Sequence, residues 1–197
     1  MSFDTLNHNN IVAFIAEILA RRGDDSYMGE AVTMSQHMLQ TAALAQKANA
    51  SKALVAASLL HDIGHYTNEF PEDALACGQD NYHETAGADV LKTFFPKSVT
   101  EPIELHVAAK RYLCAVNDKY FSRLSAASVQ SLKVQGGPMN AEEVETFRTH
   151  EYYEDALRLR AWDDEGKVAG VHTPAFADFA PSLEHLTQQH AAATVTP

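Results

Sequence analysis

The sequence has few cysteines, few basic residues and no long apolar run, and each shortage excludes a class of protein. The two cysteines among its 197 residues, Cys77 and Cys114, are too few for a disulfide framework and lack a CxxC spacing. We expect both to be free thiols in a reducing compartment. No apolar run approaches the roughly 18 residues that a membrane helix needs. The opening MSFDTLNHNN also lacks the basic and apolar regions of a secretion signal, so we expect a cytoplasmic protein with no membrane partner.

Basic residues are outnumbered by acidic ones. The chain has 15 Lys and Arg against 26 Asp and Glu, which gives a formal net charge of -11. Because a negative surface repels phosphate backbones, we do not expect nucleic acid as a partner. A small anion held in a local basic pocket stays compatible with this charge. Hydrophobic residues make up 46% of the chain, enough for a substantial core in one domain of this size.

Most of the chain shows helical periodicity. Ile11, Ile15 and Leu19 share one face of a helix that we expect to end at Gly23. The run KALVAASLLHD is apolar almost all round, which predicts a buried helix. No segment of useful length alternates with period 2. The sequence therefore predicts an all-α protein, with one helical bundle over 1–190, a frayed tail over 191–197, and longer loops at 66–82, 114–123 and 134–139.

Several histidines fall on helix faces that otherwise point inward, namely His37, His61 and His106. For any one of them alone, a structural role in the core is the more common case. Burying several imidazoles beside an aspartate costs a few kcal/mol each unless they find partners. A metal ion is the partner that suits them best, because neutral imidazole and carboxylate are natural metal ligands.

The strongest local pattern is LLHDIGH at 59–65. The adjacent His61 and Asp62, at the end of a buried helix, can direct a nitrogen and a carboxylate into one cavity. Since a carboxylate has two oxygens, Asp62 can bridge two metal ions about 3.5–4 Å apart. We expect Gly64 to end this helix, and His65 to contact a ligand residue or the substrate.

His37, HDIGH at 61–65 and an aspartate after a later helix resemble the HD-domain superfamily of helical metal-dependent enzymes. His83 and His106 resemble the dinuclear version of that superfamily. Most members are phosphohydrolases. A smaller branch, with inositol oxygenase and the organophosphonate oxygenases, uses a mixed-valent di-iron centre and O2 to cleave an unactivated bond.

Longer motifs resemble the organophosphonate oxygenases in this branch and cover nearly the whole chain outside its tail. They are YMGE at 27–30, YHE at 82–84, HVAAKRYLC at 106–114, SAASVQSLKVQGGPM at 125–139 and LRAWDDEGKV at 159–168. The resemblance implies two iron ions as Fe(II)/Fe(III), with O2 as co-substrate. It implies cleavage of the C–P bond of a 2-amino-1-hydroxyethylphosphonate-type substrate to phosphate and glycine, or an N-methylated glycine such as betaine. A 2-oxoglutarate-dependent phosphonate hydroxylase is the implied functional partner.

The resemblance also implies a ligand set for each iron. One iron would be held by His37, His61, Asp62 and Asp163, and the other by Asp62, His83 and His106. Helical spacing does not separate Asp163 from Asp164, because both follow Arg160 by about one turn; the resemblance favours Asp163. Imidazoles and carboxylates without thiolates suit iron better than they suit a structural zinc site.

A phosphonate substrate needs positive charge and hydrogen-bond donors. Lys110 lies one turn beyond His106, and Arg160 lies one turn before the C-terminal aspartates, so both are candidate phosphonate ligands. Position in the matched motifs adds three polar residues, Ser128, Ser131 and Gln135. For Ser131, simple solvation at the surface is about equally expected.

Tyr27 and Glu30 are three residues apart, on one helical face or within one turn. The resemblance implies that they gate the open iron and recognise the substrate's amino group. A carboxylate suits a primary ammonium through a charge-assisted hydrogen bond, whereas a trimethylammonium prefers aromatic faces. Glu30 therefore favours a substrate with a primary amine. Tyr27 with a nearby aromatic residue would suit the methylated substrate, so both substrates are retained as alternatives.

Two other functions compete with the oxygenase. An HD-type phosphohydrolase acting on a phosphoester or nucleotide needs the same metals but only a metal-bound water. It has no evident use for Tyr27, Glu30 and Lys110. A binding module that keeps only the helical shell is opposed by the intact ligand set, so the sequence favours the oxygenase.

Overall fold

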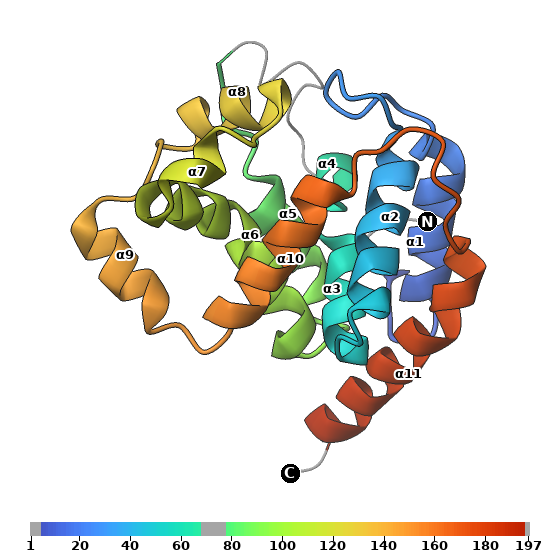
Figure 1. Ribbon diagram of the computed structural model, residues 1–197. Coiled ribbons are helices and arrows are strands. Elements are labelled where there is room, and N and C mark those ends of the chain that lie inside the picture. The colour runs from blue at the N-terminus through green and yellow to red at the C-terminus, as the bar shows by residue number, and fades with distance from the viewer. Residues whose placement is uncertain (1–4, 68–77, 196–197) are drawn as a thin grey trace.

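The structure, a computed structural model, describes residues 5–67 and 78–195, and Figure 1 shows that these residues are arranged as helices. Eleven helices occur in the described ranges: α1 (Ile11–Arg22), α2 (Met34–Lys47), α3 (Lys52–Leu60), α4 (Gly64–Thr67), α5 (His83–Leu91), α6 (Lys97–Val116), α7 (Asp118–Phe121), α8 (Ala126–Val134), α9 (Ala141–Arg148), α10 (Tyr153–Glu165) and α11 (Phe176–Val195). Within the same ranges, β pairing is limited to one isolated bridge between Ser26 and Thr33. The predicted all-α class is confirmed.

The helices that supply the site lie at the centre of the bundle. α6 packs against α3, α5 and α10, and α10 also packs against α2 and α3. Figure 1 shows α7, α8 and α9 on one side of these central helices, with α1 and α11 on the other. Side chains that project from packed helices are held more precisely than side chains on loops.

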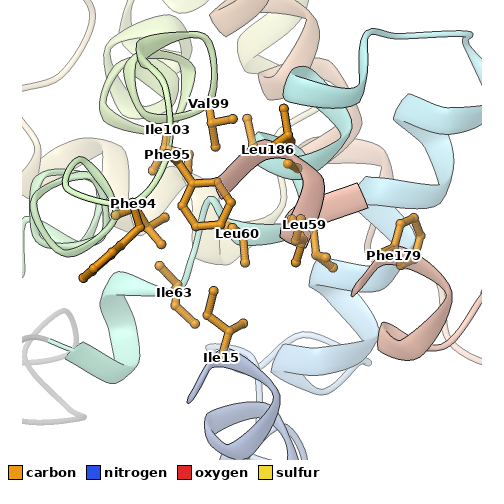
Figure 2. Packing of buried hydrophobic residues seen from close by; sticks show 14 of the residues in the cluster. Ile15, Leu59, Leu60, Ile63, Phe94, Phe95, Val99, Ile103, Phe179 and Leu186 are labelled. Carbon is orange, nitrogen blue, oxygen red and sulfur yellow. The ribbon is translucent and has the colours of Figure 1, made fainter. Parts of the chain in front are cut away.

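The hydrophobic core lies around α3, whose apolar sequence predicted burial. Figure 2 shows Leu59 and Leu60 of α3 among apolar side chains from several other elements. These neighbours include Ile15, Ile63, Phe94, Phe95, Val99, Ile103, Phe179 and Leu186. Each fully buried Leu, Ile or Phe side chain contributes about 1.5–3 kcal/mol to the free energy of unfolding. The core therefore fixes the C-terminal end of α3, where His61 and Asp62 begin.

Two predicted irregular segments are helical. The predicted tail over 191–197 continues α11 as far as Val195, because alanines at 191–193 are strong helix formers; residues 196 and 197 lie outside the described residues. The predicted loop over 114–123 is wrong. α6 runs to Val116, and Asn117 ends it and caps α7 by accepting from the Lys119 N–H.

The predicted role of Gly64 as a helix terminator is also wrong. α3 already ends at Leu60, and Gly64 is the first residue of α4. A Cβ at Gly64 would lie 1.8 Å from the His83 carbonyl oxygen and 2.7 Å from the Gly87 nitrogen. Glycine is required here because α4 and α5 approach closely, and this approach places His65 beside His83.

None of the described helices combines the length and the apolar character that a membrane-spanning helix requires.

Candidate metal centre and substrate cavity

Six side chains with metal-binding groups meet in the interior of the protein. They come from α2, the turn after α3, the start of α5, α6 and α10, and all are buried: His37, His61, Asp62, His83, His106 and Asp163. These are the six ligands implied by the family resemblance. The structure brings them together in two groups.

The first group surrounds the imidazoles of His37 and His61. Their Nε2 atoms are 3.1 Å apart, and Oδ2 of Asp62 lies 3.4 Å from each of them. Oδ1 of Asp163 lies 3.4 Å from Nε2 of His37 and 3.9 Å from Nε2 of His61. Four donor atoms therefore face one point.

The second group contains His83 and His106. Their Nε2 atoms are also 3.1 Å apart. Oδ1 of Asp62 lies 3.4 Å from Nε2 of His83 and 3.7 Å from Nε2 of His106. Asp62 thus presents one oxygen to each group, which is the arrangement of a carboxylate that bridges two metal ions.

The other ring nitrogen of each histidine determines how the ring can act. Nδ1 of His37 lies 2.9 Å from Gly166 O, and Nδ1 of His61 lies 2.9 Å from Ser58 O. Nδ1 of His83 lies 3.0 Å from Asn81 Oδ1, and Nδ1 of His106 lies 2.6 Å from Ile103 O. Each of these oxygens accepts a hydrogen bond. Because these oxygens only accept, each neutral ring carries its hydrogen on Nδ1 and has a lone pair on Nε2. Two lone pairs at 3.1 Å repel each other, and a metal cation between them removes that repulsion.

The carboxylates fit the same interpretation. Oδ2 of Asp62 and Oδ1 of Asp163 are buried and have no hydrogen-bond partner among the described residues. A buried carboxylate oxygen without a partner is costly, and coordination of a cation compensates for this cost. One ligand atom from each of His37, His61 and Asp62 lies within 4.8 Å of the other two, and the same holds for Asp62, His83 and His106. The donor set therefore fits two metal ions that share Asp62.

Electrostatics keep most of these ligands in the form that binds metal. Burial lowers the pKa of His61 and the pKa of His106, so both rings are neutral. Burial opposes ionisation of Asp62, yet the facing histidines, His61 first, hold the pKa of this carboxyl well below its usual value. Burial likewise opposes charge on His37, but the facing carboxylates of Asp163 and Asp62 raise its pKa to about 9. Metal binding replaces the proton that His37 would otherwise hold.

A cavity of about 20 Å³ adjoins the second group. It is lined by the predicted substrate residues Tyr27, Lys110, Ser128, Ser131, Gln135 and Arg160, all of which are buried. This volume is about that of one water molecule. Since a phosphonate is larger, some of the lining side chains must move when it binds.

Three cations converge on this cavity, although the chain as a whole is acidic. Lys110 Nζ donates to Ser131 Oγ at 2.7 Å and to Gln135 Oε1 at 2.5 Å. Burial, together with nearby Arg160, lowers the pKa of Lys110 to about 7. The third cation is Lys167. Together the three cations form a local basic pocket, which the net negative charge of the chain did not exclude.

Sequence reasoning missed Lys167. Its Nζ lies 3.1 Å from Ser128 Oγ and 3.6 Å from Asp163 Oδ1. Lys167 follows the end of α10, so helical spacing does not predict where its side chain points. The side chain of Gln40 fixes the next residue through two hydrogen bonds with the Val168 backbone, at 2.8 and 3.0 Å. The signal available in the sequence was its place in the motif LRAWDDEGKV, four residues after Asp163.

The structure separates the two adjacent aspartates of α10. Asp163 is buried and faces His37. Asp164 points elsewhere and binds the Arg160 guanidinium and the Tyr120 hydroxyl. Asp163 is therefore the aspartate whose carboxylate faces the first group, the one that the resemblance favours as a ligand.

Tyr27 and Glu30 lie in a tight turn and not on a helix. The Glu30 N–H donates to the Tyr27 carbonyl at 2.7 Å, and the two central residues, Met28 and Gly29, have φ of 45° and 80°. Positive φ at both central positions is typical of a type I′ turn. The ring of Tyr27 stacks on that of His37, with the ring centres 4.0 Å apart, and Oε1 of Glu30 is buried with no hydrogen-bond partner in the described part of the chain.

His65 lies against a ligand residue. Its ring stacks on His83, with the ring centres 4.1 Å apart, and its Nε2 lies 3.9 Å from Oδ1 of Asp62. It is not among the residues that line the small cavity. A direct contact with substrate therefore stays a prediction for this residue.

Comparisons with known proteins agree with this site. Residues 34–126 match the HD domain. The 1-hydroxy-2-(trimethylamino)ethylphosphonate dioxygenase (glycine-betaine-forming) of Leisingera caerulea is 48% identical over 185 residues, 94% of each chain. The hydroxymethylphosphonate dioxygenase of Gimesia maris is 42% identical over 174 residues, 88% of this chain and 86% of the relative. The resemblance inferred from the motifs is confirmed, and the chain belongs to the HD-domain phosphonate dioxygenases.

Proposed function

We propose that this protein uses O2 to cleave the C–P bond of a 2-amino-1-hydroxyethylphosphonate-type substrate at a di-iron centre, giving glycine and phosphate. The observation that carries the proposal is the bridging position of Asp62 between two ligand groups, one of which borders a cavity lined by three cations. The reaction balances with one O2 for each C–P bond, because glycine and phosphoric acid together contain two more oxygens than the substrate.

The first iron would be held by His37, His61, Asp62 and Asp163, and the second by Asp62, His83 and His106. Nitrogen and oxygen donors without thiolates support the Fe(II)/Fe(III) pair. When bound, this pair supplies the redox chemistry with O2 that no side chain can provide. The second group has three protein ligands against four in the first, so its open positions suit the substrate.

The location of the cavity also supports substrate binding at the second group. Among the described residues, its lining includes both histidines of the second group, His83 and His106, whereas the first group contributes only the carboxylates Asp62 and Asp163. A substrate in the cavity would therefore meet the second group first.

The phosphonate would bind Lys110, Arg160 and Lys167, with Ser128, Ser131 and Gln135 as hydrogen-bonding partners. Ser128 Oγ already accepts from Arg160 Nη2 at 3.4 Å and from Lys167 Nζ at 3.1 Å. A dianion favours the protonated form of Lys110 and counteracts the burial that lowers its pKa to about 7.

The amino group of the substrate would bind Glu30. Its buried Oε1 has no hydrogen-bond partner among the residues that the structure describes, and a primary ammonium offers the N–H that this oxygen lacks. Tyr27, in the same turn, lines the cavity. Burial, reinforced by Asp62 and Asp163, raises the pKa of Tyr27 well above its usual value, so the phenol is neutral.

A trimethylammonium substrate is the second candidate, and the name of the Leisingera caerulea relative favours it. The aromatic face of Tyr27 suits such a group, which has no N–H to donate. The phosphohydrolase and the non-catalytic module are no longer competitors, because the two curated relatives are named dioxygenases.

The test is O2 consumption and phosphate release with three substrates, namely the primary amine, its trimethylated form and hydroxymethylphosphonate, with metal analysis on the same sample. We expect equal amounts of O2 consumed and phosphate released, about two irons per chain, and the highest kcat/KM with the primary amine. Highest kcat/KM with the trimethylated form would support the second candidate. Undiminished phosphate release without O2 would refute the oxygenase.

The proposed substrate carries a hydroxyl group at C1, which an earlier reaction must introduce. A 2-oxoglutarate-dependent phosphonate hydroxylase is the class of enzyme that installs it, and we propose that such an enzyme acts upstream in the same cytoplasmic compartment.

A further inference from the structure

Asn81 lies between two histidines with different roles. It is 7% exposed and immediately precedes the turn into α5. Its Oδ1 lies 3.0 Å from Nδ1 of His83, and its Nδ2 lies 3.0 Å from Nδ1 of His65. The two imidazole rings are stacked with an interplanar angle of 12°, so one amide group spans both Nδ1 atoms.

The two halves of an amide impose opposite hydrogen positions on these rings. The amide oxygen only accepts, so Nδ1 of His83 carries a hydrogen and its Nε2 keeps a lone pair. The amide NH2 only donates, so Nδ1 of His65 is unprotonated and its hydrogen is on Nε2. The reversed amide would place the hydrogen of His83 on Nε2, where it would prevent metal binding. Ligation by His83 therefore determines the orientation of Asn81.

We propose that Asn81 is a positioning residue that sets opposite tautomers on two stacked histidines. It makes His83 a metal ligand and His65 a hydrogen-bond donor directed at the second group. Aspartate cannot replace it, because a carboxylate accepts from both rings and donates to neither. Gly64 supports the arrangement because it lets α4 lie against α5. A Cβ at this position would lie 1.8 Å from the His83 carbonyl oxygen.

The hydrogen on Nε2 of His65 has no acceptor among the described residues. This Nε2 is buried without a hydrogen-bond partner, at 3.9 Å from Oδ1 of Asp62. Buried donors are nearly always satisfied, so an acceptor is expected from outside the described residues. If the proposed function holds, this acceptor is an oxygen atom of the phosphonate substrate bound at the second group. The tautomer assignment itself does not depend on that step.

Long-range 1H–15N correlation spectra of the protein loaded with zinc(II), a diamagnetic substitute for iron, test the assignment directly. In the wild-type protein we expect His65 with its hydrogen on Nε2, and His83 with its hydrogen on Nδ1. In Asn81→Asp we expect the hydrogen of His65 to move to Nδ1, while His83 is unchanged. Wild-type His65 with its hydrogen on Nδ1, or no change in Asn81→Asp, would overturn the proposal. The wild-type measurement needs no variant to fold.

Glu84→Gln is the matched control. Oε2 of Glu84 lies 3.4 Å from Nδ1 of His83, so this variant changes a charge beside His83. The hydrogen-bond partner of His65 Nδ1 in the structure is Asn81 and not Glu84. We expect the His65 tautomer to stay as in the wild type. A shift in Glu84→Gln equal to that in Asn81→Asp would show that charge alone is responsible and would refute the role of Asn81.

Kinetics test the step that rests on the proposed function. Asn81→Asp should lower kcat/KM about 10- to 100-fold with iron content retained, the usual range for a residue that orients a ligand. In a His65→Gln background the same change should have little further effect, because its target is already absent. An undiminished effect there would refute action through His65. Correct tautomers in a protein without O2-dependent phosphonate cleavage would leave the positioning role intact and refute only the proposed function.

Discussion

Nη1 of Arg160 lies 2.7 Å from Oδ2 of Asp163, and both side chains are buried. The guanidinium holds the carboxylate oxygen that faces away from the metal centre. Oδ1 is left facing His37 at 3.4 Å, without a hydrogen-bond partner of its own. Arg160 therefore orients a ligand of the first group, and its other side binds Asp164.

Replacement of Arg160 by Met should destabilise the protein and weaken the first metal site. Removing one partner of a buried ion pair leaves an uncompensated charge, which costs about 3–5 kcal/mol. Thermal unfolding and metal analysis would measure both effects. Arg160→Lys should retain part of the stability, since charge remains but the bidentate geometry is lost. Arg158→Ala, which removes a half-exposed arginine of the same helix, should change the free energy of unfolding by less than about 1 kcal/mol. Equal losses in Arg160→Met and Arg158→Ala would contradict this role.

Asp62 and Asp163 should differ in how many metal ions their loss removes. Asp62→Asn should reduce the iron content of both groups, because Asp62 contributes an oxygen to each. Asp163→Asn should affect the first group alone. Metal analysis after dialysis, with thermal unfolding as a check on folding, separates the two. Loss of the same amount of iron from both variants would argue against a bridging Asp62.

Glu30→Gln should discriminate between substrates with and without an amino group. A hydrogen bond to a charged group contributes about 1.5–3 kcal/mol, so kcat/KM for the primary amine should fall about 10- to 150-fold. Hydroxymethylphosphonate, which has no amine, serves as the internal control and should change little. The variant keeps the size of the side chain and the backbone turn at Met28 and Gly29. Equal losses for the two substrates would remove Glu30 from amine recognition.

Lys110 should make phosphonate binding depend on pH near neutrality. Its pKa is lowered to about 7, first by burial and then by Arg160, so the free enzyme loses the positive charge as pH rises through that value. The protonated form binds the dianion. The affinity for the dianionic form should therefore be highest below pH 7 and fall up to about tenfold per pH unit above it. Inhibition by a non-hydroxylated phosphonate, measured from pH 6 to 9, would report this. Lys110→Arg should remove this dependence, and persistence of the slope in that variant would assign it to another group.

Gln40 should influence phosphonate binding without touching the cavity. It fixes the Val168 backbone through two hydrogen bonds and thereby places Lys167 at Ser128. Gln40→Leu should raise KM several-fold with kcat nearly unchanged, as expected when ground-state binding alone is weakened. In a Lys167→Met background the same change should have little further effect. Additive losses in the double variant would show that Gln40 acts elsewhere.

Spacing along one element predicted the parts of the site that local geometry decides. His106 and Lys110 are one turn apart on α6, and both are buried and face the centre as expected. The adjacent His61 and Asp62 follow a helix whose apolar sequence placed it in the core. In each case, backbone hydrogen bonds within a few residues determine which side chains share a face.

Motif resemblance added what spacing left open. It favoured Asp163 over Asp164 and implied two metal ions, and the buried position of Asp163 beside His37 agrees with it. It did not predict the form of the Tyr27–Glu30 segment, which is a turn with positive φ at Met28 and Gly29. A side chain can keep its chemical role while its backbone conformation depends on its neighbours.

Local patterns and motif resemblance predicted that the protein is helical, that it carries an HD-type ligand set with Asp62 between two metal ions, and where most ligands lie on their helices. Tertiary contacts decided that Lys167 completes the cation cluster and that Asn81 bridges His65 and His83. The physical reason is the range of the interactions. Helical periodicity arises from hydrogen bonds between neighbours in sequence, whereas these contacts depend on how helices far apart in sequence pack, down to the missing Cβ of Gly64.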